Sequence, residues 1–328
     1  MRRPKVSICI PAYKRVRCLR RALRSIALQT FEDYEVIITD DSPDDQVERA
    51  VEDCTLAANI IYHKNRKRLG PASNWDVAVR RASGDYVKML LTDDWFTAET
   101  SLDRLVSMLD DEPKADFGFC SSLNVSSQRA WVPHSLTEED LVTLTRQPTS
   151  LFFANIIGSP SATIYRRSHE MYDGQLKWLL DIDFYVRYLE SNPTVVFCPE
   201  PLVCVTANDG GQLSSQLAGN KFVELFEYTY LFDKLCRNDL NPISDGYLMF
   251  FARLLRKHQV KSVEDIEQLN STSSMHRRFF NAAIALSAML RCTEQKTRPW
   301  VILRSAWRNS QLERIGPVQR VLGNYFAS

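Results

Sequence analysis

Short apolar runs alternate with amphipathic segments over about the first 120 residues of the chain. The apolar runs have strand length and are rich in β-branched residues, which predicts β-strands. They comprise Val6–Ile10, Glu35–Thr39, Ile60–His63, Tyr86–Leu91 and Phe117–Cys120. Between the first two runs, apolar side chains recur at helical spacing at Leu19, Ala22, Leu23, Ile26 and Ala27. This alternation predicts a Rossmann-like, mostly parallel sheet flanked by helices, which binds ligands beyond the carboxyl ends of its strands.

The hydrophobic pattern changes twice in the remainder of the chain. From about residue 121 to 217, prolines punctuate a less regular pattern, which is typical of the half of an enzyme in which specificity is built. After about residue 219, the strand-like runs give way to helical periodicity. The predicted helices are Lys221–Arg237, Ser244–His258, Val263–Leu269 and Met275–Leu290. Strands followed by helices predict an α/β part with an α-helical C-terminal extension.

Composition narrows the class of protein without identifying it. The 328 residues suffice for two lobes or one enlarged fold, and 45% hydrophobic with 25% charged residues is typical of globular proteins. A net charge of +1 gives no electrostatic support for nucleic-acid binding. The eight cysteines are scattered singly, so neither a zinc cluster nor a disulfide framework is indicated. Because the chain begins without a signal-peptide pattern and has no window of ~18 apolar residues, we expect a cytoplasmic location.

Adjacent carboxylates follow the predicted strand Glu35–Thr39. Asp40 and Asp41 would lie at the strand's carboxyl end, where an open α/β sheet holds its ligand, and a carboxylate there can accept a hydrogen bond from a base or a ribose hydroxyl. Aspartates are also ordinary turn and N-cap residues, so the pair has a structural explanation as well.

A second pair follows the predicted strand Tyr86–Leu91, whose only interior charge is Lys88. Asp93 and Asp94 present hard oxygen atoms of the kind that Mg²⁺ or Mn²⁺ prefers when it carries a diphosphate. Two strands ending in Asp-Asp would bring four carboxylates towards one edge of the sheet. Their repulsion requires a cation or hydrogen-bond donors, which favours a binding site.

A third group of carboxylates interrupts an apolar, aromatic helix start at Asp181 and Asp183. A partly buried carboxylate there would suit a general base near neutral pH. An acidic residue that simply stabilises the N-terminus of a helix is the alternative.

Several common catalytic patterns are missing from the sequence. Asp209-Gly210-Gly211 lacks the spacing of a phosphate-binding loop, and no GxGxxG, HExxH or GxSxG pattern occurs. Nicotinamide chemistry, a paired-histidine zinc site and an activated serine therefore have little support.

An ordered series of motifs resembles the inverting glycosyltransferases of family 2, which share the GT-A fold. The strongest part comprises Val6–Tyr13, Ser25–Ser42, Gly70–Asn74, Ala82–Tyr86 and Leu91–Asp94. A weaker part comprises Gly158–Ala162, Asp181–Asp183 and Gly211–Ser214. The resemblance is highly specific over roughly the first 100 residues and reaches about residue 215.

The resemblance implies roles for particular residues. Those implied to hold the nucleotide-sugar, with an acidic group on the uracil of a UDP-sugar, are Pro11, Tyr13, Asp40, Asp41, Asn74 and Asp93. Asp93 and Asp94 represent the DxD-type motif, which contacts the donor ribose and a divalent metal, Mn²⁺ or Mg²⁺; either could be the ligand. Asp181 falls where the family's catalytic base is expected, with Asp183 as its rival. Leu91 and Leu180 stand at positions often acidic in the family.

These expectations define a function and its rivals. The chain is expected to transfer a sugar from a nucleotide-sugar to a glycan or lipid-linked acceptor in surface polysaccharide synthesis. The resemblance implies that the donor is UDP-linked. The mechanism is a single displacement in which an aspartate accepts the acceptor's proton and the metal neutralises the departing diphosphate. A non-catalytic nucleotide-sugar-binding protein is one alternative, which Leu91 and Leu180 favour. A sugar nucleotidyltransferase is the other, although its Gly-rich N-terminal signature is absent.

The expected domains are a GT-A catalytic domain, residues 1–218, and a helical region, residues 219–328. Within the first, residues 1–120 bind the nucleotide-sugar and residues 121–218 the acceptor. Residues 291–320 hold seven basic and two acidic residues interleaved with apolar ones, including Trp300 and Trp307. Such a segment suits peripheral contact with the inner face of the cytoplasmic membrane, or a helix packed on the catalytic domain or on a homodimer partner. A second basic cluster, Arg15–Arg24, could attract an anionic donor or pair with acidic neighbours.

Overall fold

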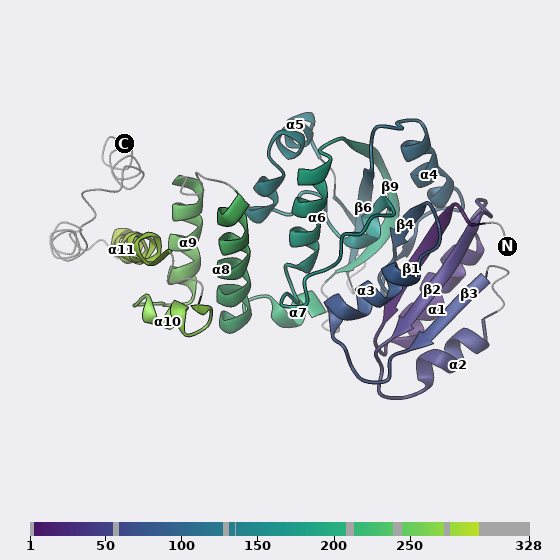
Figure 1. Cartoon of the computed structure of the whole chain (residues 1–328), viewed down its shortest axis with the longest axis horizontal. Helices are drawn as coiled ribbons and strands as arrows, with labels where there is room; N and C mark the ends of the chain where they lie inside the picture. Colours follow the sequence, from purple (N-terminus) through teal and green to yellow (C-terminus); the bar gives the residue numbers. More distant parts are fainter. Residues whose placement is uncertain are drawn as a thin grey trace. The chain divides into compact units, whose positions relative to one another are not determined.

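The computed structural model describes residues 3–54, 59–126, 131–134, 136–207, 213–238, 245–271 and 276–294. The chain forms two compact units, Met1–Gln216 and Leu217–Ser328 (Figure 1). The first contains a mixed sheet with flanking helices, and the described part of the second is helical.

Nine strands of the described residues form one sheet, in the order β3-β2-β1-β4-β8-β6-β9-β5, with β7 paired to β6. They are β1 (Val6–Ala12), β2 (Tyr34–Asp40), β3 (Asn59–Lys64), β4 (Tyr86–Met89), β5 (Trp95–Phe96), β6 (Phe117–Ser126), β7 (Trp131–His134), β8 (Thr163–Arg166) and β9 (Val195–Ala207). All five predicted strands are present. The expected parallel pairing holds for β3-β2-β1-β4, whereas β8 runs antiparallel to both β4 and β6.

The parallel register determines where the candidate site lies. Val6 pairs with Tyr34 on β2 and with Tyr86 on β4, so the three strands start level with one another. Their carboxyl ends therefore meet at one edge of the sheet, with Ala12 opposite Asp40. The segments that follow β1, β2 and β4 contain the predicted nucleotide and metal residues.

Helices cover both faces of the sheet. Those of the first unit are α1 (Val16–Ala27), α2 (Gln46–Glu52), α3 (Pro71–Arg81), α4 (Ser101–Asp110), α5 (Glu138–Arg146), α6 (Leu180–Ser191) and α7 (Leu213–Leu217), with 3-10 turns η1 (Pro148–Phe152) and η2 (Pro160–Ala162). Alternate residues of β1, such as Ile8 and Ile10, share a core with Leu23 of α1 and Leu105 of α4. Helix α3 contacts β1 and β2 outside that core. Because helices cover both faces of the sheet, the side chains on both sides of each central strand are buried, which explains the continuous apolar runs in the sequence.

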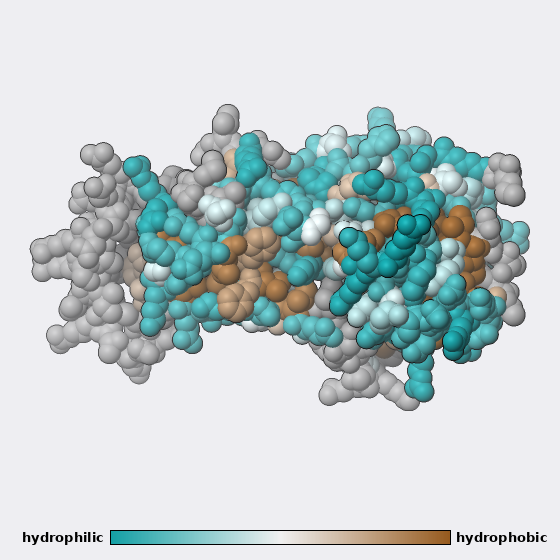
Figure 2. Space-filling view, turned by 60° about the horizontal axis from the view of Figure 1, so that its bottom comes forward, coloured by the Kyte–Doolittle hydropathy of each residue, from teal (hydrophilic) through white to brown (hydrophobic). Residues whose placement is uncertain are grey.

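The apolar stripe predicted for the first helix is confirmed except at its end. Leu19, Ala22, Leu23 and Ile26 are buried, whereas Ala27, the last residue of α1, is exposed. Few large apolar side chains of the described residues are strongly exposed. Figure 2 shows hydrophilic residues over much of the drawn face, with areas of apolar residues between them.

The described part of the second unit consists of α8 (Lys221–Asn238), α9 (Asp245–Lys257), α10 (Glu264–Glu267) and α11 (Arg277–Glu294), in agreement with the four predicted helices. Phe232 of α8 lies in ring contact with Phe251 of α9 and Phe279 of α11, with centroids 5.1 and 4.8 Å apart. Among the described helices, none combines the length and the apolar character needed to cross a membrane. Most of the basic segment 291–320 lies outside the described residues, so its membrane contact stays a prediction.

Candidate functional site

The chain turns sharply after β1. Pro11 is buried, and Tyr13 is 37% exposed. Lys14 and Arg15 follow with φ values of 58° and 53°, a left-handed conformation that is unfavourable for side-chain-bearing residues. The turn is held by the Lys14 amide, which donates to Ser42 Oγ at 2.6 Å. It places the Tyr13 ring beside two cations, with Arg68 4.5 Å and Lys14 5.3 Å from the ring centroid.

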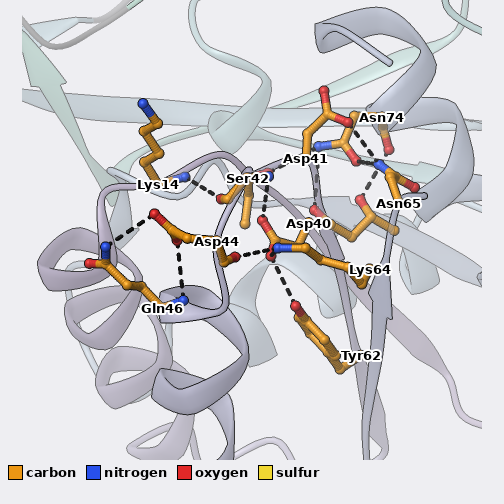
Figure 3. Close-up of polar contacts among 12 residues, drawn as sticks. Lys14, Asp40, Asp41, Ser42, Asp44, Gln46, Tyr62, Lys64, Asn65 and Asn74 are labelled. Carbon is orange, nitrogen blue, oxygen red and sulfur yellow. Dashed lines mark hydrogen bonds and ion pairs between the residues drawn. The ribbon is translucent and has the colours of Figure 1, made fainter. Parts of the chain in front are cut away.

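Asp40 ends β2 in a fully buried position (Figure 3). Its carboxylate accepts hydrogen bonds from the Ser42 amide at 2.8 Å, the Tyr62 hydroxyl at 2.9 Å and Lys64 Nζ at 2.8 Å. Burial, together with the Asp40 carboxylate, raises the pKa of the Tyr62 phenol. Asp40 thus connects the ends of β2 and β3.

Asp41 and Asn74 organise the loop between β3 and α3 (Figure 3). The Asp41 carboxylate accepts from the amides of Leu69 and Gly70, both at 2.8 Å, and from Asn65 Nδ2 at 3.1 Å. Asn65 Nδ2 also donates to Asn74 Oδ1 at 2.8 Å, and Asn74 Nδ2 donates to the main chain of β1 and β2. These side chains hold residues 65–70 against the carboxyl edge of the sheet.

Asp93 lies beyond β4, next to the turn that follows β1. Its Oδ2 pairs with Arg15 Nη1 at 2.9 Å, and 14% of its side chain is exposed. Arg21 donates to the Asp93 carbonyl at 2.6 Å and stacks on Trp95, 3.6 Å from the ring centroid. Two arginines of the basic cluster therefore have acidic or carbonyl partners at this site.

Asp94 has the opposite environment, because its side chain is buried. Its carboxylate accepts from the Thr206 amide at 3.0 Å and from Ser159 Oγ at 3.2 Å. Burial first, and then the charge of Asp93, raises the pKa of Asp94 to about 7. Lys88 is also fully buried, and burial lowers its pKa to about 8.

Asp181 and Asp183 both lie in the first turn of α6, but their partners differ. Asp183 is 1% exposed and is bound by Arg187 Nε at 3.0 Å and Nη2 at 2.9 Å. Asp181 is only partly buried; its Oδ1 accepts from the Ile182 amide at 2.9 Å and its Oδ2 from Asn155 Nδ2 at 3.2 Å. Of the two, Asp181 is the carboxylate that solvent can reach.

Hydrogen bonds connect the groups that the sequence placed far apart. Thr92 donates to the Pro11 carbonyl at 2.8 Å, which joins the ends of β4 and β1. Residues 155–161 connect Asp94, through Ser159, with Asp181, through Asn155. Sequence patterns alone do not assign roles to four of these residues, which are Arg15, Asn155, Ser159 and Thr206. Arg15 belongs to the predicted basic cluster and Ser159 to a family motif, whereas no pattern indicates the other two.

A divalent cation sets requirements that the aspartates of this site meet to different degrees. Mg²⁺ commonly uses one or two protein carboxylates and completes its shell with water and substrate phosphates. Asp93 fits this mode if the cation displaces Arg15 from its carboxylate, since 14% of the Asp93 side chain is exposed. Asp94 fits poorly as a direct ligand, because its side chain is buried and its two oxygens accept internal hydrogen bonds. No group of three His, Cys, Asp or Glu suited to a metal is found in the part of the chain that the structure describes.

Solved structures share this architecture. Residues 1–349 of TarS from S. aureus, in complex with UDP-GlcNAc, match with a TM-score of 0.59 at 17% identity, covering 95% of this chain and 92% of that one. The mannosyltransferase PcManGT from Pyrobaculum calidifontis, in complex with GDP-Man and Mn²⁺, matches with a TM-score of 0.55 at 16% identity, covering 98% and 83%. The mixed sheet and its flanking helices therefore have the GT-A glycosyltransferase fold.

Sequence comparison identifies the family. The model of glycosyl transferase family 2 matches residues 7–171, about half of the chain, and the chain belongs to this family. Full-length TarS, a poly(ribitol-phosphate) β-N-acetylglucosaminyltransferase of Staphylococcus aureus, is 27% identical over 221 residues, which are 64% of this chain and 37% of TarS. A GalNAc(5)-diNAcBac-PP-undecaprenol β-1,3-glucosyltransferase of Campylobacter jejuni is 33% identical over 93 residues, 28% of this chain and 30% of that protein. The match spans only 14% of an uncharacterised glycosyltransferase of Rickettsia bellii, at 32% identity over 96 residues, 29% of this chain.

Proposed function

We propose that the chain is an inverting glycosyltransferase that moves a sugar from a UDP-linked donor to a saccharide or lipid-linked saccharide acceptor in surface polysaccharide synthesis. One observation carries the proposal: Asp94, the neighbour of Asp93, and Asp181 come from distant parts of the sequence and are connected through residues 155–161. Membership of family 2 supports sugar transfer. The names of the relatives support a polymer or lipid-linked acceptor.

The donor's nucleotide is proposed to lie at the ends of β1 and β2. Tyr13 provides a surface for the base, while the buried Pro11 ties the end of β1 to Thr92 through its carbonyl. The exposed residues 66–68, Arg-Lys-Arg, give this edge the positive charge that a diphosphate requires. Asp40, Asp41 and Asn74 serve the nucleotide by holding residues 65–70 and the end of β1 in place, because their polar atoms already bind the protein.

Asp93 is the proposed ligand of a divalent cation that arrives with the donor. Such a cation, when bound, neutralises the charge that develops on the leaving diphosphate. Asp94 helps to position Asp93, since its hydrogen bonds with Thr206 and Ser159 hold the segment after β4 in place. Arg15 and Arg21 supply further positive charge beside the diphosphate.

Asp181 is the proposed general base. Its carboxylate accepts the proton of the acceptor hydroxyl as that hydroxyl attacks the anomeric carbon, and a single displacement inverts the configuration there. Asp183 is not suited to this role, because it is buried and bound twice by Arg187. Its ion pair instead connects α6 to Glu170 through the same arginine.

The neighbouring aspartates of α6 test this assignment. In Asp181→Asn we expect the turnover of a UDP-sugar, assayed as UDP release with a mixture of envelope saccharide acceptors, to fall by roughly 10²- to 10⁴-fold. The Kd of UDP with Mn²⁺, measured by calorimetry, should be unchanged. The matched variant Asp183→Asn should instead lose about 1–3 kcal/mol of unfolding free energy, because Arg187 loses its buried partner but keeps Glu170.

Two results would contradict the proposal. Wild-type turnover in Asp181→Asn would exclude Asp181 as the base. Tight binding of UDP-sugars by the wild-type chain, with no transfer to any acceptor and no hydrolysis, would indicate the non-catalytic alternative.

A further inference from the structure

Asn155 lies in the loop after η1 and is held in one orientation by Gly158. Its Oδ1 accepts the Gly158 amide hydrogen at 2.9 Å, and its Nδ2 donates to the Gly158 carbonyl at 3.1 Å. An amide N–H can only face an acceptor, so the first bond determines which side of the carboxamide is oxygen. The nitrogen must then lie towards Asp181 Oδ2, 3.2 Å away.

The turn that orients Asn155 is itself constrained. Gly158 has a φ of +87°, a conformation that side-chain-bearing residues rarely adopt. A Cβ at this position would lie 3.1 Å from Cδ2 of His134. The ring of His134 is held in turn by Ile156, whose carbonyl lies 3.0 Å from Nε2. The position of the Asn155 amide is therefore over-determined by its surroundings.

The same loop also bonds to the segment that carries Asp93 and Asp94, the aspartates after β4. Immediately after Gly158, Ser159 Oγ donates to Asp94 Oδ2 at 3.2 Å. Ser161 Oγ accepts the Leu91 amide at 2.9 Å. Residues 155–161 are thus bonded at one end to Asp181 and at the other to the segment that carries Asp93 and Asp94.

We propose that Asn155 is a positioning residue for Asp181: its amide aims the base, and residues 155–161 set the base at a defined place relative to the donor. The inference rests on the proposed role of Asp181. Asn155 acts through the Asp181 carboxylate and not on the donor, so its contribution should be to turnover rather than to donor binding. Small displacements of a catalytic group have large costs, on the order of 10²-fold for about 1 Å.

Asn155→Asp tests this directly, because the substitution preserves shape. The new carboxylate can still accept the Gly158 amide, but it cannot donate to Asp181 and instead repels it. We expect kcat to fall roughly 10- to 100-fold, with the KM of the UDP-sugar and the Kd of UDP within about twofold of wild type.

The chain offers a matched control at the other end of α6. Asn192 Oδ1 accepts the Thr194 amide at 3.1 Å, and its Nδ2 donates to Asp116 Oδ2 at 2.8 Å and to the Lys114 carbonyl at 3.1 Å. Asn192→Asp therefore places a second carboxylate beside an aspartate in the same way, away from the site. It should keep wild-type kcat, while its loss of melting temperature should resemble that of Asn155→Asp.

Comparison with Asp181 variants separates failure of this inference from failure of the proposed function. If Asn155 acts through Asp181, Asn155→Ala should cost nothing further in an Asp181→Ala background. Wild-type kcat in Asn155→Asp, additive losses in the double variant, or a loss of UDP binding as large as the loss of turnover would each overturn the inference. Undiminished turnover in Asp181→Ala would overturn the base assignment instead.

Discussion

Asp93 and Asp94 are adjacent in sequence, yet their carboxylates meet different surroundings. The Asp93 side chain is partly exposed and pairs with Arg15. Asp94 points into the protein, where burial raises its pKa to about 7. Burial disfavours the charged form of Asp94, and a metal ligand must be charged. We therefore assign the proposed cation to Asp93.

The raised pKa of Asp94 predicts a dependence of stability on pH. The folded state binds this proton below about pH 7, whereas the unfolded state binds it only near the ordinary value of 3.8, so folding stability falls as pH rises between these values. Asp94→Asn removes this titration. From about pH 5.5 to about pH 8, we expect the unfolding free energy of wild type to fall by about 2 kcal/mol relative to the variant, at 1.36 kcal/mol per pH unit.

Urea denaturation at both pH values in the presence of EDTA measures this difference. Groups distant from Asp94 that titrate in the interval cancel, because both proteins contain them. A difference that stays constant between the two pH values would mean that Asp94 is ionised in the folded state throughout.

The strands are braced at the edge opposite the site. Glu35 of β2 accepts from Ser7 Oγ of β1 at 2.5 Å and from the Ser83 amide at 2.7 Å. Ser7 Oγ in turn accepts the Gly84 amide at 2.8 Å, just before β4 begins. This network brings the main chain of residue 84 close to β1, and it helps align the strands whose far ends carry the site.

Gly84→Ala should disrupt this close approach. A Cβ at residue 84 would lie 2.7 Å from the Ser7 amide nitrogen and 2.8 Å from the Val6 carbonyl carbon, which are main-chain atoms that cannot rotate away. We expect a loss of about 1–3 kcal/mol in unfolding free energy by urea denaturation. Gly174→Ala is the control, since its nearest neighbour would be 3.9 Å away, and its effect should stay within about 0.5 kcal/mol. Equal effects of the two substitutions would contradict the steric explanation.

The molecule divides into two units after Gln216, near the proposed domain boundary at residue 218. All residues of the proposed donor and base sites lie in the first unit, together with the sheet and its core. The second has a core of its own around Phe232. A unit that contains both its core and its binding site is expected to fold and bind without the rest of the chain.

The fragment 1–218 should therefore unfold cooperatively and bind UDP. We expect UDP and Mn²⁺ to add a similar unfolding free energy to the fragment and to the whole chain, because this stabilisation depends on ligand concentration and Kd alone. A folded fragment that UDP does not stabilise, while it stabilises the whole chain, would show that residues 219–328 contribute to donor binding.

Much of the architecture could be predicted from the order of residues along the chain. The strands and helices are encoded in local periodicity, so Val6–Ile10 and Lys221–Arg237 could be assigned without knowing their partners. The parallel arrangement then placed Asp40, Asp41, Asp93 and Asp94 at one edge, because alternating strands and helices permit few topologies. Asp181 required the family resemblance as well, since a carboxylate at a helix start has several explanations.

The partners of those carboxylates became visible only in the folded chain. Arg15 with Asp93, Asn155 with Asp181 and Thr206 with Asp94 are pairs separated by 78, 26 and 112 residues, and no spacing rule connects them. Their environments, not their residue type, distinguish the proposed metal ligand Asp93 from the buried Asp94, and the proposed base Asp181 from the ion-paired Asp183. Local pattern specifies the elements, whereas burial and charge pairing arise when distant segments pack together, so the division of roles among these aspartates belongs to the fold.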